Sequence, residues 1–147
     1  MRTSVKIEYG FYIPNRMEEG YGLSVATLEK AYMKGYRNII TVDNGVRAIE
    51  AMNYIKDHHM RLLLSDHHTY DPDDIICDCL IHPFLAHDEF ENCCGAGIAL
   101  QIARCLIPYD KEIVALAALA TVADCMPVTK ENRRIIKKGI EFLNQGC

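Results

Sequence analysis

One stretch constrains this chain more than any other, namely Leu62-Leu63-Leu64-Ser65-Asp66-His67-His68. The leucines and the serine predict a buried strand, and an acid and two histidines follow it at once. Because unpaired charge is costly among apolar residues, packing alone does not account for this abrupt change. Open α/β sheets bind ligands at the carboxyl ends of their strands, so we expect a site there. Carboxylate with imidazole suits a divalent metal such as Mn²⁺ or Mg²⁺ together with phosphate.

The composition is that of an ordinary globular domain without a basic surface. The 147 residues suffice for one domain with a hydrophobic core, and 50% of them are hydrophobic. A net charge of −4 disfavours a broad cationic face for double-stranded DNA, although a local phosphate site or a narrow single-strand groove remains compatible with it. No apolar run reaches membrane-spanning length and no signal peptide is recognisable, so we expect a cytoplasmic protein.

The chain contains 7 cysteines, an odd number, and they are unevenly spaced. Neither Cys77-x-Cys79 nor Cys93-Cys94 has the CxxC spacing of zinc sites. On a strand, Cys77 and Cys79 would share one face, as core residues do. We therefore expect structural thiols rather than a zinc site.

Strand and helix patterns alternate along the chain, which favours an α/β fold with a mostly parallel sheet flanked by helices. The expected strands cover 5–13, 38–42, 61–65 and 79–81. The expected helices are one that Ser24 caps and Gly35 ends, and then 47–59, 95–106, 112–123 and 131–143. The almost wholly apolar helix over 112–123 is expected to be buried. No linker or repeat divides the chain, so we expect a single domain over 1–147.

Several apolar elements of the chain end in an aspartate. Asp43 and Asp66 each follow an expected strand, and Asp124 follows an expected buried helix. One aspartate at such a place is usually a turn former. Three of them, with His67 and His68 directly after one, favour a metal site instead.

A second triplet, Asp57-His58-His59, repeats the Asp-His-His pattern. It lies at the end of an amphipathic helix, where histidine is well solvated and interacts favourably with the helix dipole. Because ligands of open sheets bind at strand ends, we expect a structural role for this triplet.

Two further features are compatible with phosphate binding and also with a simpler role. Gly95 and Gly97 lie at the entry to a helix, where backbone N–H groups hold a phosphate or where glycine permits close helix packing. Arg16 lies in a glycine-containing loop and pairs either with phosphate or with Glu18 or Glu19. The residues alone leave both pairs of alternatives open.

Five blocks of the chain stand in the order and spacing of a known family. They are Tyr12-Ile13-Pro14-Asn15-Arg16 with Glu19-Gly20-Tyr21-Gly22-Leu23, Thr41-Val42-Asp43-Asn44-Gly45, Ser65-Asp66-His67-His68, Gly95-Ala96-Gly97-Ile98-Ala99, and Thr121-Val122-Ala123-Asp124-Cys125-Met126-Pro127. These blocks resemble the RecJ-like single-strand-specific 5′→3′ exonucleases, and the agreement with the DHH phosphoesterase domain covers essentially the whole chain. The resemblance implies the DHH fold, phosphodiester hydrolysis in DNA recombination and repair, and single-stranded DNA as the partner. Arg16 would hold a DNA phosphate, and Gly95 and Gly97 would lie near the nucleic acid.

The resemblance also implies how the site works. The family binds two Mn²⁺ or Mg²⁺ ions, which clamp the phosphate between them. Asp43 would bridge the two metals, and His67 and Asp124 would ligate one of them. Asp66 would orient these ligands from behind, and His68 would face the scissile phosphate.

The departures from the family pattern set the expected activity. The aspartate-rich motif that supplies most ligands of the other metal does not precede Val5, and the family's second domain and OB-fold do not follow Cys147. Ile81-His82-Pro83 stands where the family usually has Asn-Pro, so His82 departs from the family pattern. We therefore expect an internal piece of a RecJ-like protein, with one fully ligated metal at most and little or no nuclease activity alone. Exposed sheet edges would invite a homodimer.

Two alternatives stay open. One is a DHH phosphodiesterase acting on oligonucleotides or cyclic dinucleotides, against which the blocks around Arg16 speak. The other is a non-catalytic remnant that binds nucleic acid or a partner. Joint retention of Asp43, His67 and Asp124 argues against that remnant.

Overall fold

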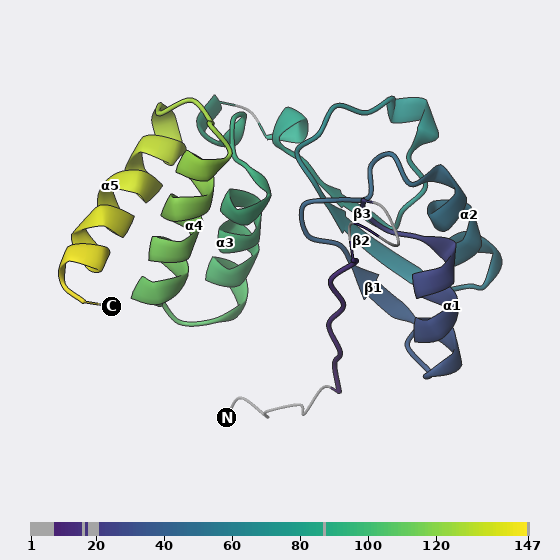
Figure 1. Cartoon of the computed structure of the whole chain (residues 1–147). Coiled ribbons are helices and arrows are strands. Elements are labelled where there is room, and N and C mark those ends of the chain that lie inside the picture. The colour runs from purple at the N-terminus through teal and green to yellow at the C-terminus, as the bar shows by residue number, and fades with distance from the viewer. Residues whose placement is uncertain (1–7, 16, 18–20, 87, 147) are drawn as a thin grey trace.

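The structure, a computed structural model, describes residues 8–146 except 16, 18–20 and 87 (Figure 1). Its elements in chain order are α1 (Val25–Met33), β1 (Asn38–Ile40), α2 (Ile49–Asp57), β2 (Arg61–Ser65), η1 (Pro72–Asp74), β3 (Cys79–Ile81), η2 (Pro83–Leu85), η3 (Asp88–Phe90), α3 (Gly95–Leu106), α4 (Lys111–Ala123) and α5 (Lys130–Asn144). The expected α/β class is confirmed. Among the described residues, no helix is long and apolar enough to cross a membrane.

The sheet is parallel, with the strands in the order β1-β2-β3. The central strand β2 carries the three leucines, and Leu62 and Leu64 are both 0% exposed. Because side chains alternate between the faces of a strand, these two leucines point to one face, which α1 and α2 cover. The apolar run therefore forms the buried strand that the sequence predicts.

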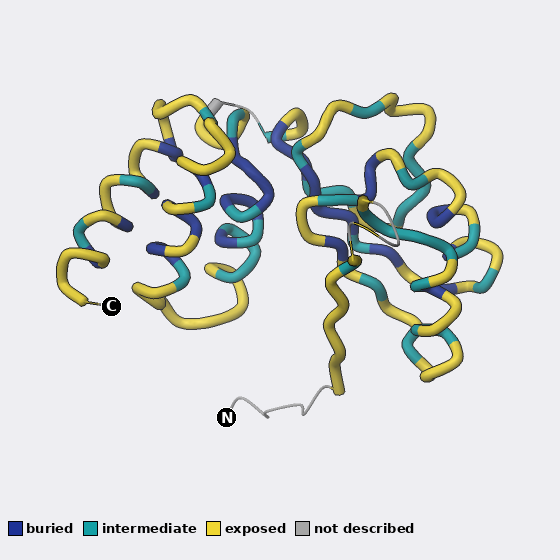
Figure 2. Tube along the Cα trace, in the orientation of Figure 1, coloured by how far each residue is buried: buried dark blue, intermediate teal, exposed yellow. Residues whose placement is uncertain are grey.

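The hydrophobic core has two parts. The first lies between the sheet and its two covering helices, and consists of Leu28, Val46, Ala51, Met52, Ile55, Met60, Leu62 and Leu64. The second lies inside the bundle of α3, α4 and α5, and consists of Leu100, Val114, Ala115, Ala117, Ala118, Ile135 and Phe142. Figure 1 shows this bundle on the side of the sheet opposite to α1 and α2, and Figure 2 shows the two buried zones. The fold thus has two packed halves, and they meet at the metal site that the sequence predicts.

The expected first strand is wrong in the part that the structure describes. Residues 8–13 form no strand, and residues 5–7 lie outside the described residues. Tyr9, Phe11 and Ile13 are 82%, 87% and 81% exposed, so the alternating pattern does not pack against a core here. An extended segment becomes a strand only when a neighbouring strand takes up its backbone hydrogen bonds. The described sheet begins instead with β1.

The expectation of a fully buried α4 is also wrong. Val114 and Ala118 are buried against the other two helices of the bundle. Leu116, Leu119 and Val122 are 59%, 52% and 57% exposed. The bundle thus covers one face of α4, so an apolar sequence alone did not reveal how many faces are packed.

Candidate metal centre

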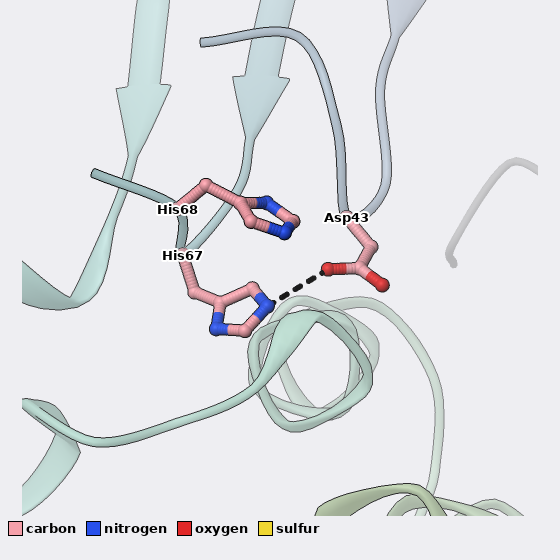
Figure 3. Close-up of side chains that lie close together, drawn as sticks. All are labelled: Asp43, His67 and His68. Carbon is pink, nitrogen blue, oxygen red and sulfur yellow. Dashed lines mark ion pairs between the residues drawn. The ribbon is translucent and has the colours of Figure 1, made fainter. Parts of the chain in front are cut away.

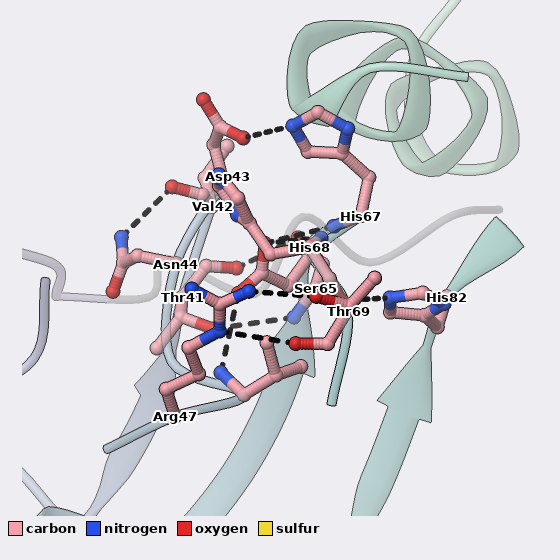
Figure 4. Close-up of polar contacts among 12 residues, drawn as sticks. Thr41, Val42, Asp43, Asn44, Arg47, Ser65, His67, His68, Thr69 and His82 are labelled. Carbon is pink, nitrogen blue, oxygen red and sulfur yellow. Dashed lines mark hydrogen bonds and ion pairs between the residues drawn. The ribbon is translucent and has the colours of Figure 1, made fainter. Parts of the chain in front are cut away.

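The ends of β1 and β2 stay in step beyond the last residue of β1 (Figure 4). The N–H of Thr41 donates to the carbonyl of Leu63, and the N–H of Asp43 donates to the carbonyl of Ser65, both at 3.0 Å. The Ser65 hydroxyl returns a bond of 2.8 Å to the carbonyl of Thr41. This shared register brings Asp43 and Asp66 to one edge of the sheet, as predicted.

Asp43 is held against the start of α3. Its φ of 64° lies in the left-handed region, which aspartate tolerates better than most residues. A Cβ atom at Gly95 would overlap the Asp43 side chain, so the close approach requires glycine there. A carboxylate is also favoured at a helix N-terminus. Gly97 is the other glycine for which phosphate binding was predicted. Its N–H donates to the Sγ of Cys94 at 3.4 Å, and this hydrogen bond caps the N-terminus of α3.

The His67 ring lies between two carboxylates. Its Nε2 is 3.1 Å from Oδ1 of Asp43, as Figure 3 shows, and 3.4 Å from Oδ2 of Asp124. Asp124 is the C-cap residue of α4, so the helical bundle supplies one acid to an edge that the sheet builds. Burial raises the pKa of Asp43, and the neighbouring His67 and His68 oppose that rise. The structure therefore brings together the predicted ligands Asp43, His67 and Asp124.

Asp66 is the buried anchor of the loop after β2, with 1% of its surface exposed. Its Oδ2 accepts from the N–H of Val46 at 3.1 Å. Its Oδ1 accepts from the N–H of His67 at 2.8 Å, and from the N–H and Nδ1 of His68 at 3.3 and 2.6 Å. Burial alone would raise the pKa of Asp66, but these bonds together lower it below its ordinary value. The carboxylate therefore stays ionised and orients both histidines.

The tautomer of His68 follows from this bond. Since an ionised Asp66 can only accept, the Nδ1 of His68 carries a proton, and in the neutral ring Nε2 keeps a lone pair for a metal or another donor. In the part of the chain that the structure describes, one group of side chains could ligate a metal, namely Asp43, His67 and His68. One ligand atom from each of them lies within 4.8 Å of the other two. Asp124 lies next to this group, because its Oδ2 is 3.4 Å from the Nε2 of His67. Oxygen and imidazole donors of this kind fit Mn²⁺ or Mg²⁺.

Two further side chains, Arg47 and His82, hold the loop after β2, and the sequence alone predicted a role for neither. Arg47 donates from Nε to the carbonyl of Thr69 at 3.1 Å and from Nη2 to its hydroxyl at 2.7 Å. His82 is 3% exposed, and its Nε2 lies 2.9 Å from the carbonyl oxygen of His68. Burial lowers the pKa of His82, which favours a neutral ring. The only signal in the sequence was the departure of His82 from the family pattern.

The remaining predicted residues lie elsewhere. The Asp57-His58-His59 triplet ends α2, as predicted, and the His58 ring stacks on Tyr54 with 3.8 Å between ring centroids. Arg16 lies outside the described residues. Cys93 and Cys94 are buried at the entry to α3, and burial raises the pKa of the Cys93 thiol to about 11. A thiol with so high a pKa is unreactive, in agreement with a structural role.

Comparison with known proteins assigns the family. The family model "DHH family, N-terminal domain" matches residues 2–126. The chain belongs to the DHH family. The single-stranded-DNA-specific exonuclease RecJ of Bacillus subtilis is 33% identical over an alignment of 138 positions, which covers 92% of this chain and 18% of that protein. RecJ of Haemophilus influenzae is 30% identical over an alignment of 148 positions, which covers 88% of this chain and 25% of that protein.

Two solved structures share the fold. A crystal structure of exonuclease RecJ bound to manganese superposes with a TM-score of 0.74 at 29% identity, over 88% of this chain and 34% of that one. RecJ of Thermus thermophilus in complex with Mn²⁺ superposes with a TM-score of 0.63 at 26% identity, over 76% of this chain and 18% of that one. The predicted family resemblance and the predicted DHH fold class are thereby confirmed. The chain spans only 18% and 25% of the length of the two curated relatives named above.

Substitution of Gly95 by alanine tests the contact that holds Asp43. We expect at least a tenfold loss of Mn²⁺ affinity, because the new methyl group would displace the Asp43 carboxylate. Calorimetric titration with Mn²⁺ measures it. Gly97→Ala is the matched control in the same helix, because its Cβ would meet Cys93 at an ordinary 3.4 Å. Equal affinities of the two variants would contradict this account of Asp43.

Substitution of Asp66 by asparagine tests the buried anchor. We expect a loss of about 2–4 kcal/mol in the free energy of unfolding at pH 7, because charged hydrogen bonds are lost and an NH₂ group faces N–H donors. The pKa of Asp66 is lowered in the folded state, so its stabilisation is complete above the ordinary carboxyl value and is lost as the pH falls through the folded value.

Urea unfolding of wild type and Asp66→Asn should therefore give free energies that converge as the pH falls below about 4. Asp57→Asn, at an exposed position at the end of α2, is the control and should differ little from wild type. A difference between wild type and Asp66→Asn that does not change with pH would contradict the ionised state of Asp66.

Proposed function

We propose that this chain is the core of a metal-dependent 5′→3′ exonuclease that hydrolyses single-stranded DNA in recombination and repair. The observation that carries the proposal is the convergence of Asp43, His67 and Asp124 at the carboxyl edge of a parallel sheet. Membership of the DHH family supports it, as do RecJ relatives named for this activity and two similar structures that contain manganese. Such an enzyme works where the DNA is, which favours the cytoplasm.

The side chains divide the work. A divalent cation, when bound, would polarise the phosphoryl group and lower the pKa of water. Asp43 and Asp124 would hold it by charge, with the imidazole of His67 between them. Asp66 binds Nδ1 of His68, which leaves Nε2 to face the phosphate and, when protonated, to donate to it. Arg16, Gly95 and Gly97 as contacts to DNA remain predictions that follow from the family resemblance.

We further propose that one metal at most is fully ligated within this 147-residue chain. The support is that the described residues contain a single group of metal-ligating side chains, built around Asp43 and His67. Two-metal catalysis depends on charge stabilisation by both ions, each worth several kcal/mol. Removal of one such contribution lowers the rate by about a thousandfold or more.

Metal binding and hydrolysis test the proposal together. Calorimetry with Mn²⁺ should show one site in the wild type and none in His67→Ala, while His59→Ala, at the exposed end of α2, should bind like the wild type. Release of 5′ nucleotides from labelled single-stranded DNA should be at least about a thousandfold slower than for a full-length RecJ, and should disappear in His67→Ala.

The other outcomes favour other functions. Two Mn²⁺ sites with full activity would contradict the half-assembled centre. Faster hydrolysis of a cyclic dinucleotide or of short oligonucleotides would favour the broader DHH phosphodiesterase. DNA binding without any Mn²⁺ binding would favour a non-catalytic module.

We also propose that a second copy of the chain pairs along the outer edge of β1. β1 lies at the edge of the described sheet, and Ile40 and Val42 at this edge are 65% and 49% exposed. Sedimentation should show a dimer that Ile40→Lys converts to a monomer, because a buried lysine at the strand edge opposes pairing. A monomeric wild type at 100 µM would contradict the dimer.

A further inference from the structure

His82 reaches the site loop from the third strand. It follows β3 directly, and its Nε2 lies 2.9 Å from the carbonyl oxygen of His68 (Figure 4). Its other ring nitrogen, Nδ1, accepts a bond of 3.2 Å from the N–H of Phe84. Because Nδ1 is an acceptor, a neutral ring carries its proton on Nε2, which donates to His68. Both nitrogens of this buried ring are therefore used.

Packing leaves the His82 ring one orientation. The rings of Tyr70 and Phe84 have centroids 4.6 and 5.0 Å from that of His82. The backbone of His82 is extended, with φ −144° and ψ 141°, as expected of a residue before proline. The donor on Nε2 thus comes from a rigid position rather than from a mobile surface side chain.

His68 is held from two sides by buried groups. Asp66 binds its N–H and its ring Nδ1, and His82 binds its carbonyl oxygen. The backbone at His68 therefore has fixed partners for both of its polar groups. A change at His82 would free the carbonyl and allow the peptide after His68 to rotate, which would tilt the ring away from Asp43 and His67.

We propose that His82 is a positioning residue that aims the His68 ring at the place where Asp43 and His67 converge. His82 itself lies outside the group of metal-ligating side chains in the described residues, so it acts through His68. The catalytic consequence rests on the proposed phosphodiester hydrolysis, whereas the positioning itself is open to test without any substrate. Supporting contacts of this kind typically change affinity or activity by about 10–100-fold when removed.

Two substitutions separate the donor from the ring. His82→Gln places an N–H₂ group at about the reach of Nε2, and His82→Phe keeps the ring while removing both hydrogen bonds. We expect kcat on single-stranded DNA to fall by about 10–100-fold in His82→Phe with little change in KM, and to recover to within about threefold of wild type in His82→Gln. His59→Phe, at the exposed end of α2, is the control and should retain wild-type kcat.

Nitrogen-15 NMR of the metal-free protein supplies the measurement that needs no activity. The wild type should show His82 protonated on Nε2 and not on Nδ1, and a downfield Nδ1 proton of His68 that is bonded to Asp66. That proton signal should move upfield or broaden in His82→Phe and remain in His82→Gln. The His82 tautomer is read in the wild type, so the test survives even if His82→Phe does not fold.

The outcomes of the two functional proposals are distinguishable. If the wild type binds no Mn²⁺, the exonuclease proposal fails, and the NMR signals of the metal-free protein still decide the role of His82. The opposite His82 tautomer, an unchanged His68 proton in His82→Phe, or equal losses of kcat in the phenylalanine and glutamine variants would each overturn the positioning role.

Discussion

The site depends on one buried charge, the carboxylate of Asp66. A charge at 1% exposure is stable only when its oxygens are fully bonded, and here they accept from Val46, His67 and His68. These bonds determine how β2 ends and tie its end to the segment before α2. They also set the direction of both histidines. The ligand geometry is thus a consequence of satisfying Asp66.

The second constraint is the lack of a side chain at Gly95. The room that this glycine leaves admits the carboxylate of Asp43 to the start of α3. The contact of His67 with Asp124 makes a second connection, because Asp124 caps the end of α4. Sheet and bundle each have their own hydrophobic core, and these polar contacts join them. The same residues that could hold a metal therefore also hold the two halves together.

Much of this arrangement follows from the sequence. The predicted bounds of β2, β3 and α3 agree with the structure, because caps, glycines and abrupt changes of polarity mark their ends. The position rule for sheet ligands separates the triplet at Asp66 from the similar one at Asp57, since only the former follows a strand. Convergence of Asp43 and Asp66 was predictable because parallel strands end at a common edge.

The misses share a physical cause, which is that a pattern does not specify its partner. The alternating residues 8–13 look like a strand, but strand formation depends on a neighbour. The apolar sequence of α4 does not indicate whether one face or all faces of the helix are covered. Leu116 and Leu119 are in fact exposed. The bond between His82 and the backbone of His68 joins a side chain to a carbonyl, so no residue type at position 68 signals it.

The division into two cores has a thermodynamic consequence. Ligands from the sheet and from the bundle would share one ion, so ion occupancy and docking of the halves form a single linked equilibrium. At a free ion concentration of a hundred times Kd, the docked state gains about 2.7 kcal/mol. By reciprocity, a change deep inside the bundle that loosens docking lowers the affinity for the ion, although it touches no ligand.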